Sequence, residues 1–382
     1  MVLGVAAEAK SAVVPGGAEV SGMSSLLHLA AALDLPGIPD AGAYVELGRL
    51  AERGGLDFVT LDDSFGRPGP DALGVLCRVA PATRRIGLVP TVTTTHTEPF
   101  QVQAAVATLD WVSRGRAGWR IDVSTTEGEA RLFGRRHTAP AEALWQEAGE
   151  VADVAARLWD SWEDGAEIRD VAGGRFLDRD RLHRVDFTGT AFSVRGPSTV
   201  PRPPQGHPVR VVDATDGPAR AVAARYADVA LVRVAAPAQA AGARGELRER
   251  ARAAGRNPDA LRVLVSLLVD LGDGEHAAEP GHGGGGPRPT GRGPLYRGGP
   301  VDLAELVAAW HADGVTDGFH LVPVEPRRDL ERLVNGTVAL LQHRGQFRTF
   351  YPGSTLREHL GLTRPANQYA VPGATAATGG AS

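Results

Sequence analysis

Cysteine is almost absent from the sequence, and its scarcity limits what the protein can be. The 382 residues include one cysteine, Cys77, so no disulfide can form within the chain and no metal site can be built from several thiolates. No apolar run approaches the roughly 18 residues that a membrane-spanning helix needs, and residues 1–22 lack the basic start and apolar core of a secretory signal. We therefore expect a cytoplasmic protein without membrane contact.

An excess of positive charge is also missing. Lysine and arginine total 41 against 45 aspartate and glutamate residues, which gives a net charge of −4. Proteins that bind nucleic acid usually carry a basic face, so the charge balance argues against a nucleic-acid partner.

The clearest positive feature is an alternation of short apolar runs with amphipathic stretches. Each run has the length of a strand, and each following stretch has the apolar spacing of a helix. The expected strands are residues 26–33, 57–61, 86–92, 117–123, 209–212, 229–234, 261–271 and 318–322. Eight strand–helix units are typical of an α/β fold of the (β/α)8 TIM barrel type. A doubly wound sheet is the alternative, but no Gly-x-Gly-x-x-Gly turn follows the first strand, which weakens it.

The pattern also predicts how the chain is organised around this barrel. We expect one barrel domain with an insertion after the fourth helix, which folds over the barrel mouth or forms an oligomer contact, and an extended C-terminal tail. A Gly/Pro/His-rich stretch reads as a mobile loop rather than a metal-binding tract. The expected segments are the barrel at 25–370, the insertion at about 160–207, the mobile loop at about 272–299, a disordered leader at 1–24 with Met23 as a possible start, and a disordered tail at 371–382.

Functional side chains of such a barrel lie where strands end. Asp63 follows the second expected strand and is either a catalytic carboxylate or a helix cap. Thr93 belongs to a run of hydroxyl residues that suits a polar ring or phosphate but is also ordinary strand filler. Arg120 requires an anion or a carboxylate partner, and Asp122 on the same strand face is one candidate.

Three histidines are candidates for acid/base chemistry. His96, His137 and His320 each either transfer protons or serve as packing and capping residues. No Gly-x-Ser-x-Gly, His-Glu-x-x-His or Gly-x-x-x-x-Gly-Lys motif is present. Residue spacing alone therefore indicates a barrel enzyme of unspecified chemistry without a metal.

Several longer segments resemble one family. They are SRGRAGW at 113–119, LWDSWEDGA at 158–166, VRGP at 194–197, PRPPQG at 201–206 and LQHRGQFRTFYPGSTLREHLGL at 341–362. They are similar to bacterial-luciferase-like flavin-dependent monooxygenases, in the branch of the nitrilotriacetate, alkane and dibenzothiophene-sulfone monooxygenase large components. The resemblance implies a barrel that receives reduced FMN from a separate NAD(P)H:flavin reductase and uses O2 to oxidise a small organic substrate. It also implies a homo-oligomer.

The resemblance extends to single positions, with departures. Asp63, Thr93 and Ser124 match family residues beside the flavin ring, whereas Arg120 stands where the family has asparagine. Where the family has a tyrosine and a Gln-Ala-Gly-x-Ser segment near the flavin phosphate, this chain has a tryptophan and VDATD at 212–216. The expected cofactor-binding residues are Asp63, Thr93, Arg120, Ser124, Trp145, Ala214, Thr215 and Asp216, and the expected proton donors are His137 and His320.

These departures leave two other functions open. One is a non-catalytic barrel subunit whose flavin-phosphate site has degraded, because two carboxylates in the 212–216 segment would repel a phosphate dianion. The other is a deazaflavin-dependent dehydrogenase on the same barrel.

Overall fold

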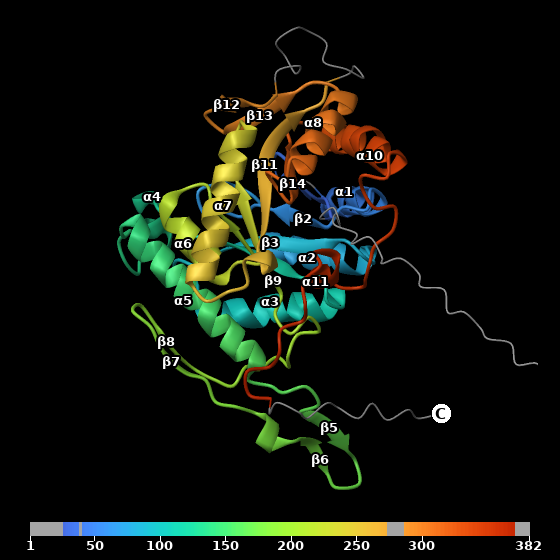
Figure 1. The fold of residues 1–382 in the computed structure, drawn as a ribbon. Helices are drawn as coiled ribbons and strands as arrows, with labels where there is room; N and C mark the ends of the chain where they lie inside the picture. Colours follow the sequence, from blue (N-terminus) through green and yellow to red (C-terminus); the bar gives the residue numbers. More distant parts are fainter. Residues whose placement is uncertain (1–25, 38–39, 273–285, 371–382) are drawn as a thin grey trace, which may run out of the picture.

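A closed barrel of eight parallel strands forms the centre of the molecule (Figure 1). The computed structural model describes residues 26–37, 40–272 and 286–370. The strands lie in the order β10, β9, β4, β3, β2, β1, β14, β11, and β10 pairs with β11 to close the circle. Their bounds are β1 His28–Ala32, β2 Phe58–Leu61, β3 Gly87–Thr93, β4 Gly118–Asp122, β9 Val209–Asp213, β10 Val229–Val232, β11 Arg262–Asp270 and β14 Gly318–Pro323. The expected TIM barrel is confirmed.

Helices surround the strands, and most begin close to where the sequence predicts. Those expected are α1 Ala41–Arg53, α2 Ala72–Val79, α3 Pro99–Ser113, α5 Ala141–Asp160, α6 Gly217–Tyr226, α7 Pro237–Ala253, α8 Pro300–Ala312, and α9 Pro326–Arg332, which continues through a π-helical turn into α10 Ala339–His343. Asp40 and Asp71 cap α1 and α2 by accepting backbone N–H bonds. Two short helices were not expected, α4 Glu127–Phe133 and α11 Leu356–His359.

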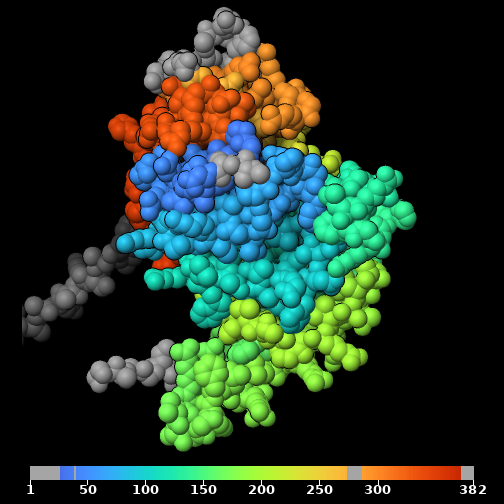
Figure 2. All heavy atoms as spheres, turned by 180° about the vertical axis from the view of Figure 1, so that it is seen from behind, coloured from blue at the N-terminus to red at the C-terminus, as the bar shows by residue number. Residues whose placement is uncertain are grey.

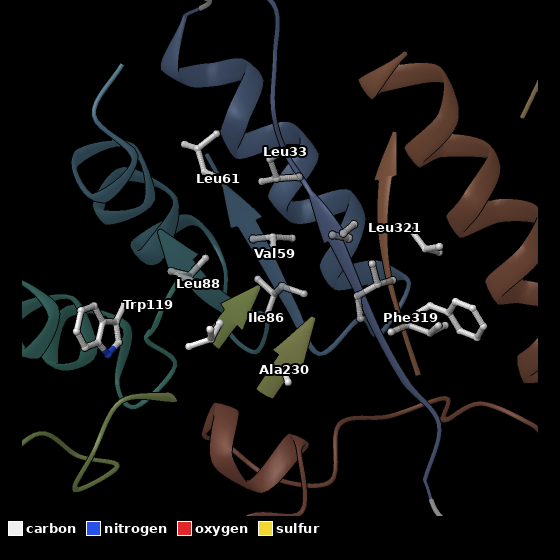
Figure 3. Packing of buried hydrophobic residues seen from close by; sticks show 14 of the residues in the cluster. Leu33, Val59, Leu61, Ile86, Leu88, Trp119, Ala230, Phe319 and Leu321 are labelled. Carbon is white, nitrogen blue, oxygen red and sulfur yellow. The ribbon is translucent and has the colours of Figure 1, made fainter. Parts of the chain in front are cut away.

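Strand side chains alternate between two apolar layers, as the pleat requires. The outer layer packs between strands and helices, and Figure 3 shows Phe319 and Leu321 of β14 directed toward the neighbouring helices. The inner layer fills the barrel and includes Phe58, and it also contains Leu356 and Leu360 from the C-terminal segment. These side chains fill the amino-terminal end of the barrel, and the cavity described below opens at the carboxyl ends of the strands.

The insertion after α5 forms two antiparallel hairpins rather than an irregular stretch. These are β5 Glu167–Asp170 with β6 Arg175–Leu177, and β7 Asp186–Thr188 with β8 Ser193–Arg195. They extend away from the barrel (Figure 1), and in the reverse view of Figure 2 they form a green projection below the blue and cyan body. No residue of these hairpins lines the large cavity at the barrel mouth described below, so the insertion does not cover that cavity.

Part of the expected mobile loop at 272–299 forms regular structure, and its mobility stays a prediction. Residues after 285 form a hairpin of β12 Arg288–Thr290 and β13 Gly293–Arg297. Strand β11 is longer than β10, and β13 pairs in parallel with its upper end from Leu268 to Asp270. The free edge of β11 therefore orders a sequence whose glycine and proline content suggested a linker. The remainder of that loop, the leader and the tail lie outside the described residues.

None of the helices in the described part of the chain is long and apolar enough to cross a membrane.

Candidate active site

A cavity of about 580 Å³ opens at the carboxyl ends of the barrel strands. We call it the mouth cavity. Its walls combine apolar side chains with carboxylates and guanidinium groups from seven barrel strands or the loops after them, and the turn between β12 and β13 also contributes. The residues that the argument uses are Asp34, Asp62, Arg67, Arg120, Asp213, Leu231, Arg233, Ser266, Leu268, His320 and Val322.

His320 of β14 lies at the cavity wall between two hydroxyl groups. Its Nε2 lies 2.8 Å from Thr60 Oγ1 and its Nδ1 lies 3.0 Å from Ser266 Oγ, so both ring nitrogens are hydrogen bonded. Burial, aided by the nearby positive charge of Arg120, lowers the pKa of His320 to about 3. The imidazole is therefore neutral at physiological pH, with one hydroxyl donating to it and the other accepting from it.

An ion pair crosses the mouth from β4 to the end of β2. Arg120 Nη2 donates to Asp62 Oδ1, and Arg67 Nη1 donates to Asp62 Oδ2 at 2.7 Å. Asp122, the partner considered from the sequence, lies 4.0 Å from Arg120 at its Oδ2 atom. Since β3 lies between β4 and β2 in the barrel, the Arg120–Asp62 pair passes over the end of β3. It separates the mouth cavity from the hydroxyl residues of that strand.

A second ion pair joins the last residue of β9 to the residue that follows β10. Arg233 Nε donates to Asp213 Oδ2 at 2.8 Å, and the backbone N–H and hydroxyl of Thr215 donate to Asp213 Oδ1 at 3.1 and 2.6 Å. Burial alone would raise the pKa of Asp213, but Arg233 and the Thr215 hydroxyl outweigh it and the pKa lies below its usual value. Asp213 is therefore a stable anion, and it occupies the polar groups of Thr215.

Asp34 follows β1 and lines the same cavity. Its pKa is raised, whereas that of Asp213 is lowered. Its Oδ1 accepts the backbone N–H of Asp62 at 2.7 Å. Burial raises the pKa of Asp34, and the nearby charge of Asp62 acts in the same sense. This carboxyl group is thus the one at the cavity wall best able to retain a proton.

The expected flavin-side residues Asp63 and Thr93 lie together, but beside a different cavity. Both line a space of about 260 Å³, with Thr91, that shares no lining residue with the mouth cavity. Asp63 Oδ2 accepts the backbone N–H of Ala72 at 2.9 Å, which is the capping role considered from the sequence. Thr91 Oγ1 is buried and has no hydrogen-bond partner among the described residues.

The remaining expected site residues are dispersed. Ser124 Oγ donates to Glu129 Oε2 of α4 at 2.6 Å, and Trp145 lines a groove between α5 and α6. Ala214 is fully buried, whereas Asp216 is exposed at the N-cap of α6. The structure therefore brings only Arg120 and His320 of the ten expected residues to the mouth cavity, and the binding roles of the others stay predictions.

The expected proton donor His137 also lies apart from the mouth cavity. Its side chain is 93% exposed and its Nδ1 lies 2.8 Å from Glu127 Oε1. Sequence reasoning did not single out Asp34, Ser266 and Arg233, which line the cavity, or Thr60, which contacts His320. Each has the inward parity of its strand, and that parity is the signal that would have found them.

Comparison with known proteins now identifies the family. The profile of the luciferase-like monooxygenases matches residues 21–282. The chain belongs to the luciferase-like monooxygenase family. As a member it is a flavin-dependent monooxygenase, which confirms the expectation from the sequence segments. No group of three or more His, Cys, Asp or Glu side chains suited to a metal ion occurs within the described residues.

Individual relatives cover almost the whole chain. The chain is 31% identical over 401 residues to N-acetyl-S-(2-succino)cysteine monooxygenase of Bacillus subtilis (strain 168), covering 86% of this chain and 91% of the relative. It is 32% identical over 418 residues to nitrilotriacetate monooxygenase component A of Aminobacter aminovorans, covering 87% and 92%. The crystal structure of a long-chain alkane monooxygenase superimposes with a TM-score of 0.79 at 21% identity, covering 89% of this chain and 96% of that one, and supports the barrel fold.

Proposed function

We propose that the protein is the oxygenase of a two-component system: the mouth cavity takes up reduced FMN, made by a separate NAD(P)H:flavin reductase, and a small organic substrate is oxidised there with O2. The observation that carries this proposal is the cavity itself, about 580 Å³ at the carboxyl ends of the strands with Arg120 fixed at its wall. The relative from Aminobacter aminovorans is named as component A of its enzyme, which supports a division of labour with a second protein. We place this system in the cytoplasm and expect a homo-oligomer.

The chemistry of the cavity walls fits a flavin ring. Leu231, Leu268 and Val322 supply apolar contact, and Ser266 supplies a hydroxyl group. Arg120 uses Nη2 for Asp62, and its Nε and Nη1 make no hydrogen bond within the described residues. A positive charge beside the N1 side of a reduced flavin stabilises the negative charge that the ring carries there. Arg120 would therefore hold the ring and favour its reduced form.

Bound reduced flavin supplies the electrons that activate O2, and the protein orients and shelters the reacting groups. His320 holds Thr60 and Ser266 in place as a neutral imidazole, and with a pKa of about 3 it is not a proton donor near pH 7. Asp34, whose pKa is raised by burial, is the better candidate to deliver a proton from the cavity wall.

An anaerobic titration tests the proposal. The full-length protein is titrated with oxidised FMN and then with dithionite-reduced FMN, and flavin fluorescence reports binding. We expect saturable binding of the reduced form. Replacing Arg120 by glutamine should weaken that binding at least about tenfold, or about 1.4 kcal/mol.

The matched control is Arg195→Gln, because Arg195 lies on the β7–β8 hairpin away from the mouth cavity and its side chain is 89% exposed. We expect less than a twofold change in this variant, since an exposed ion pair contributes little. Reduced FMN that does not bind up to high micromolar concentrations, with a folded protein, contradicts the proposal.

A non-catalytic barrel subunit is the second candidate, and one observation favours it. The largely buried Arg120 and the half-exposed Arg233 at the mouth both have aspartate partners already, so these two ion pairs are electrically balanced without a ligand. In that case the chain alone binds no reduced flavin, and a homologous flavin-binding subunit has to accompany it when it is purified from its own cells.

A further inference from the structure

The mouth of this barrel has the chemistry to hold a flavin ring but not a phosphate dianion. We propose that the site recognises the flavin by its ring alone and that Asp213 and Asp216 make it indifferent to the phosphate, so that riboflavin and FMN bind about equally well. This inference rests on the proposed function, because it assumes that the mouth cavity takes up a reduced flavin.

The loop after β9 shows why a phosphate gains little there. Thr215 offers a hydroxyl and a backbone N–H, the two groups that a phosphate would use, but both donate to Asp213. The hydroxyl of Thr215 also accepts the backbone N–H of Arg233 at 3.0 Å. A phosphate at this loop would have to break these bonds and approach the Asp213 carboxylate.

The positive charge of Arg233 is already engaged and is not offered to a phosphate. Its Nε and Nη2 both donate to Asp213 Oδ2, so the guanidinium neutralises the carboxylate beside it. The corresponding pair of Arg120 with Asp62 also has no net charge. A ring with one delocalised negative charge needs only the free edge of Arg120, whereas a dianion needs cationic or N–H groups that have no other partner.

The N-termini of the helices that follow the barrel strands also carry acidic side chains. Backbone N–H groups at a helix N-terminus favour phosphate, and a carboxylate placed there competes with it. Seven helices directly follow a barrel strand in the described chain, and six of them have an acidic residue at the N-cap or in the first turn. These residues are Asp40 of α1, Asp71 of α2, Glu98 of α3, Glu127 of α4, Asp216 of α6 and Glu325 of α9.

Asp216 opposes a phosphate most directly. Its side chain is exposed and makes no capping hydrogen bond to α6, and it forms no ion pair with the described residues. Pro218 in the first turn of α6 removes one of the N–H groups that could have bound an anion. Asp213 thus lines the mouth cavity, and Asp216 adds an exposed carboxylate three residues further along the same loop.

The test compares two flavins that differ only in the phosphate. Dissociation constants of reduced riboflavin and reduced FMN are measured anaerobically on the full-length protein, by flavin fluorescence. We expect the two constants to agree within about threefold. The Asp216→Ser variant should bind FMN at least about fivefold more tightly and leave riboflavin binding unchanged, because only FMN carries the phosphate that the aspartate repels.

The control is Asp186→Ser, which removes the same charge from an exposed position on the β7–β8 hairpin and should change neither constant. Thermal melts establish that both variants are folded. The inference is overturned if the wild-type protein binds FMN at least about tenfold more tightly than riboflavin, or if Asp216→Ser leaves FMN binding unchanged. If neither flavin binds, the proposed function fails together with the inference, and that result is distinct from a preference for FMN.

Discussion

The neutral state of His320 makes a quantitative prediction about stability. Its pKa falls to about 3 in the folded protein, whereas an unfolded chain has the ordinary value of 6.5. Between these two values the unfolded state binds a proton that the folded state does not, so stability is present above the unfolded pKa and is lost as the pH falls. For one such group, lowering the pH from about 7 to about 5 removes about 2 kcal/mol of the free energy of unfolding.

The variant His320→Asn isolates this contribution. It removes the titrating ring and keeps a polar side chain between Thr60 and Ser266. Urea denaturation at pH 5, 6 and 7 gives the free energy of unfolding of both proteins. The wild-type protein should lose about 2 kcal/mol more than the variant over this range. His207 and His359 also have lowered pKa values, but they are the same in both proteins and cancel in the comparison.

Parallel pH dependence of the two proteins would refute the reasoning. It would mean that His320 takes up a proton in the folded state near its ordinary pKa, against the burial and the nearby Arg120. The proton donor would then have to be reconsidered, because a histidine that titrates near neutrality at the cavity wall would compete with Asp34 for that role.

Two further predictions concern the closed end of the barrel. An alanine Cβ at Gly118 would lie 2.8 Å from the carbonyl oxygen of Val209, so Gly118→Ala should destabilise the protein by about 1–3 kcal/mol. The control is Gly217→Ala, whose Cβ meets no atom within 4 Å and which should change the free energy of unfolding by less than about 0.5 kcal/mol. Leu356→Ala removes a fully buried side chain that fills the barrel and should lower the free energy of unfolding by about 2–5 kcal/mol. The control is Leu132→Ala, at a residue 69% exposed, which should lower it by less than about 0.5 kcal/mol. Urea denaturation measures all four, and equal effects within either pair would contradict the packing described here.

The strands were predictable because each is an apolar run that must be buried on both faces. Residues 57–61 and 318–322 read as strands from the sequence, and the structure has β2 and β14 there. Helix α4 was missed because it buries a single side chain, Ala130, and so lacks an apolar stripe. The β12–β13 hairpin was missed for a different reason: its order depends on the free edge of β11, which no local pattern reveals.

The site was harder to predict because its contacts join side chains of different strands. Arg120 pairs with Asp62 and Arg233 with Asp213, and neither pair follows from spacing without knowledge of the strand order. Strand alternation does place Asp62 and Asp63 on opposite sides, but it does not say which side is the mouth. The resemblance to the family favoured Asp63, whereas Asp62 is the residue that faces the mouth cavity.

The pairing of β13 with β11 has a consequence for how this protein can change over evolutionary time. The hydrogen bonds that close the barrel run through β10, β11 and β14, and the β12–β13 hairpin is added outside that circuit. Its turn nevertheless forms one wall of the mouth cavity, from Gly291 to Pro294. Insertions or substitutions in this turn would reshape the space offered to a substrate while every barrel hydrogen bond stays in place. Substrate choice can therefore diverge among descendants of this chain without an accompanying loss of foldability.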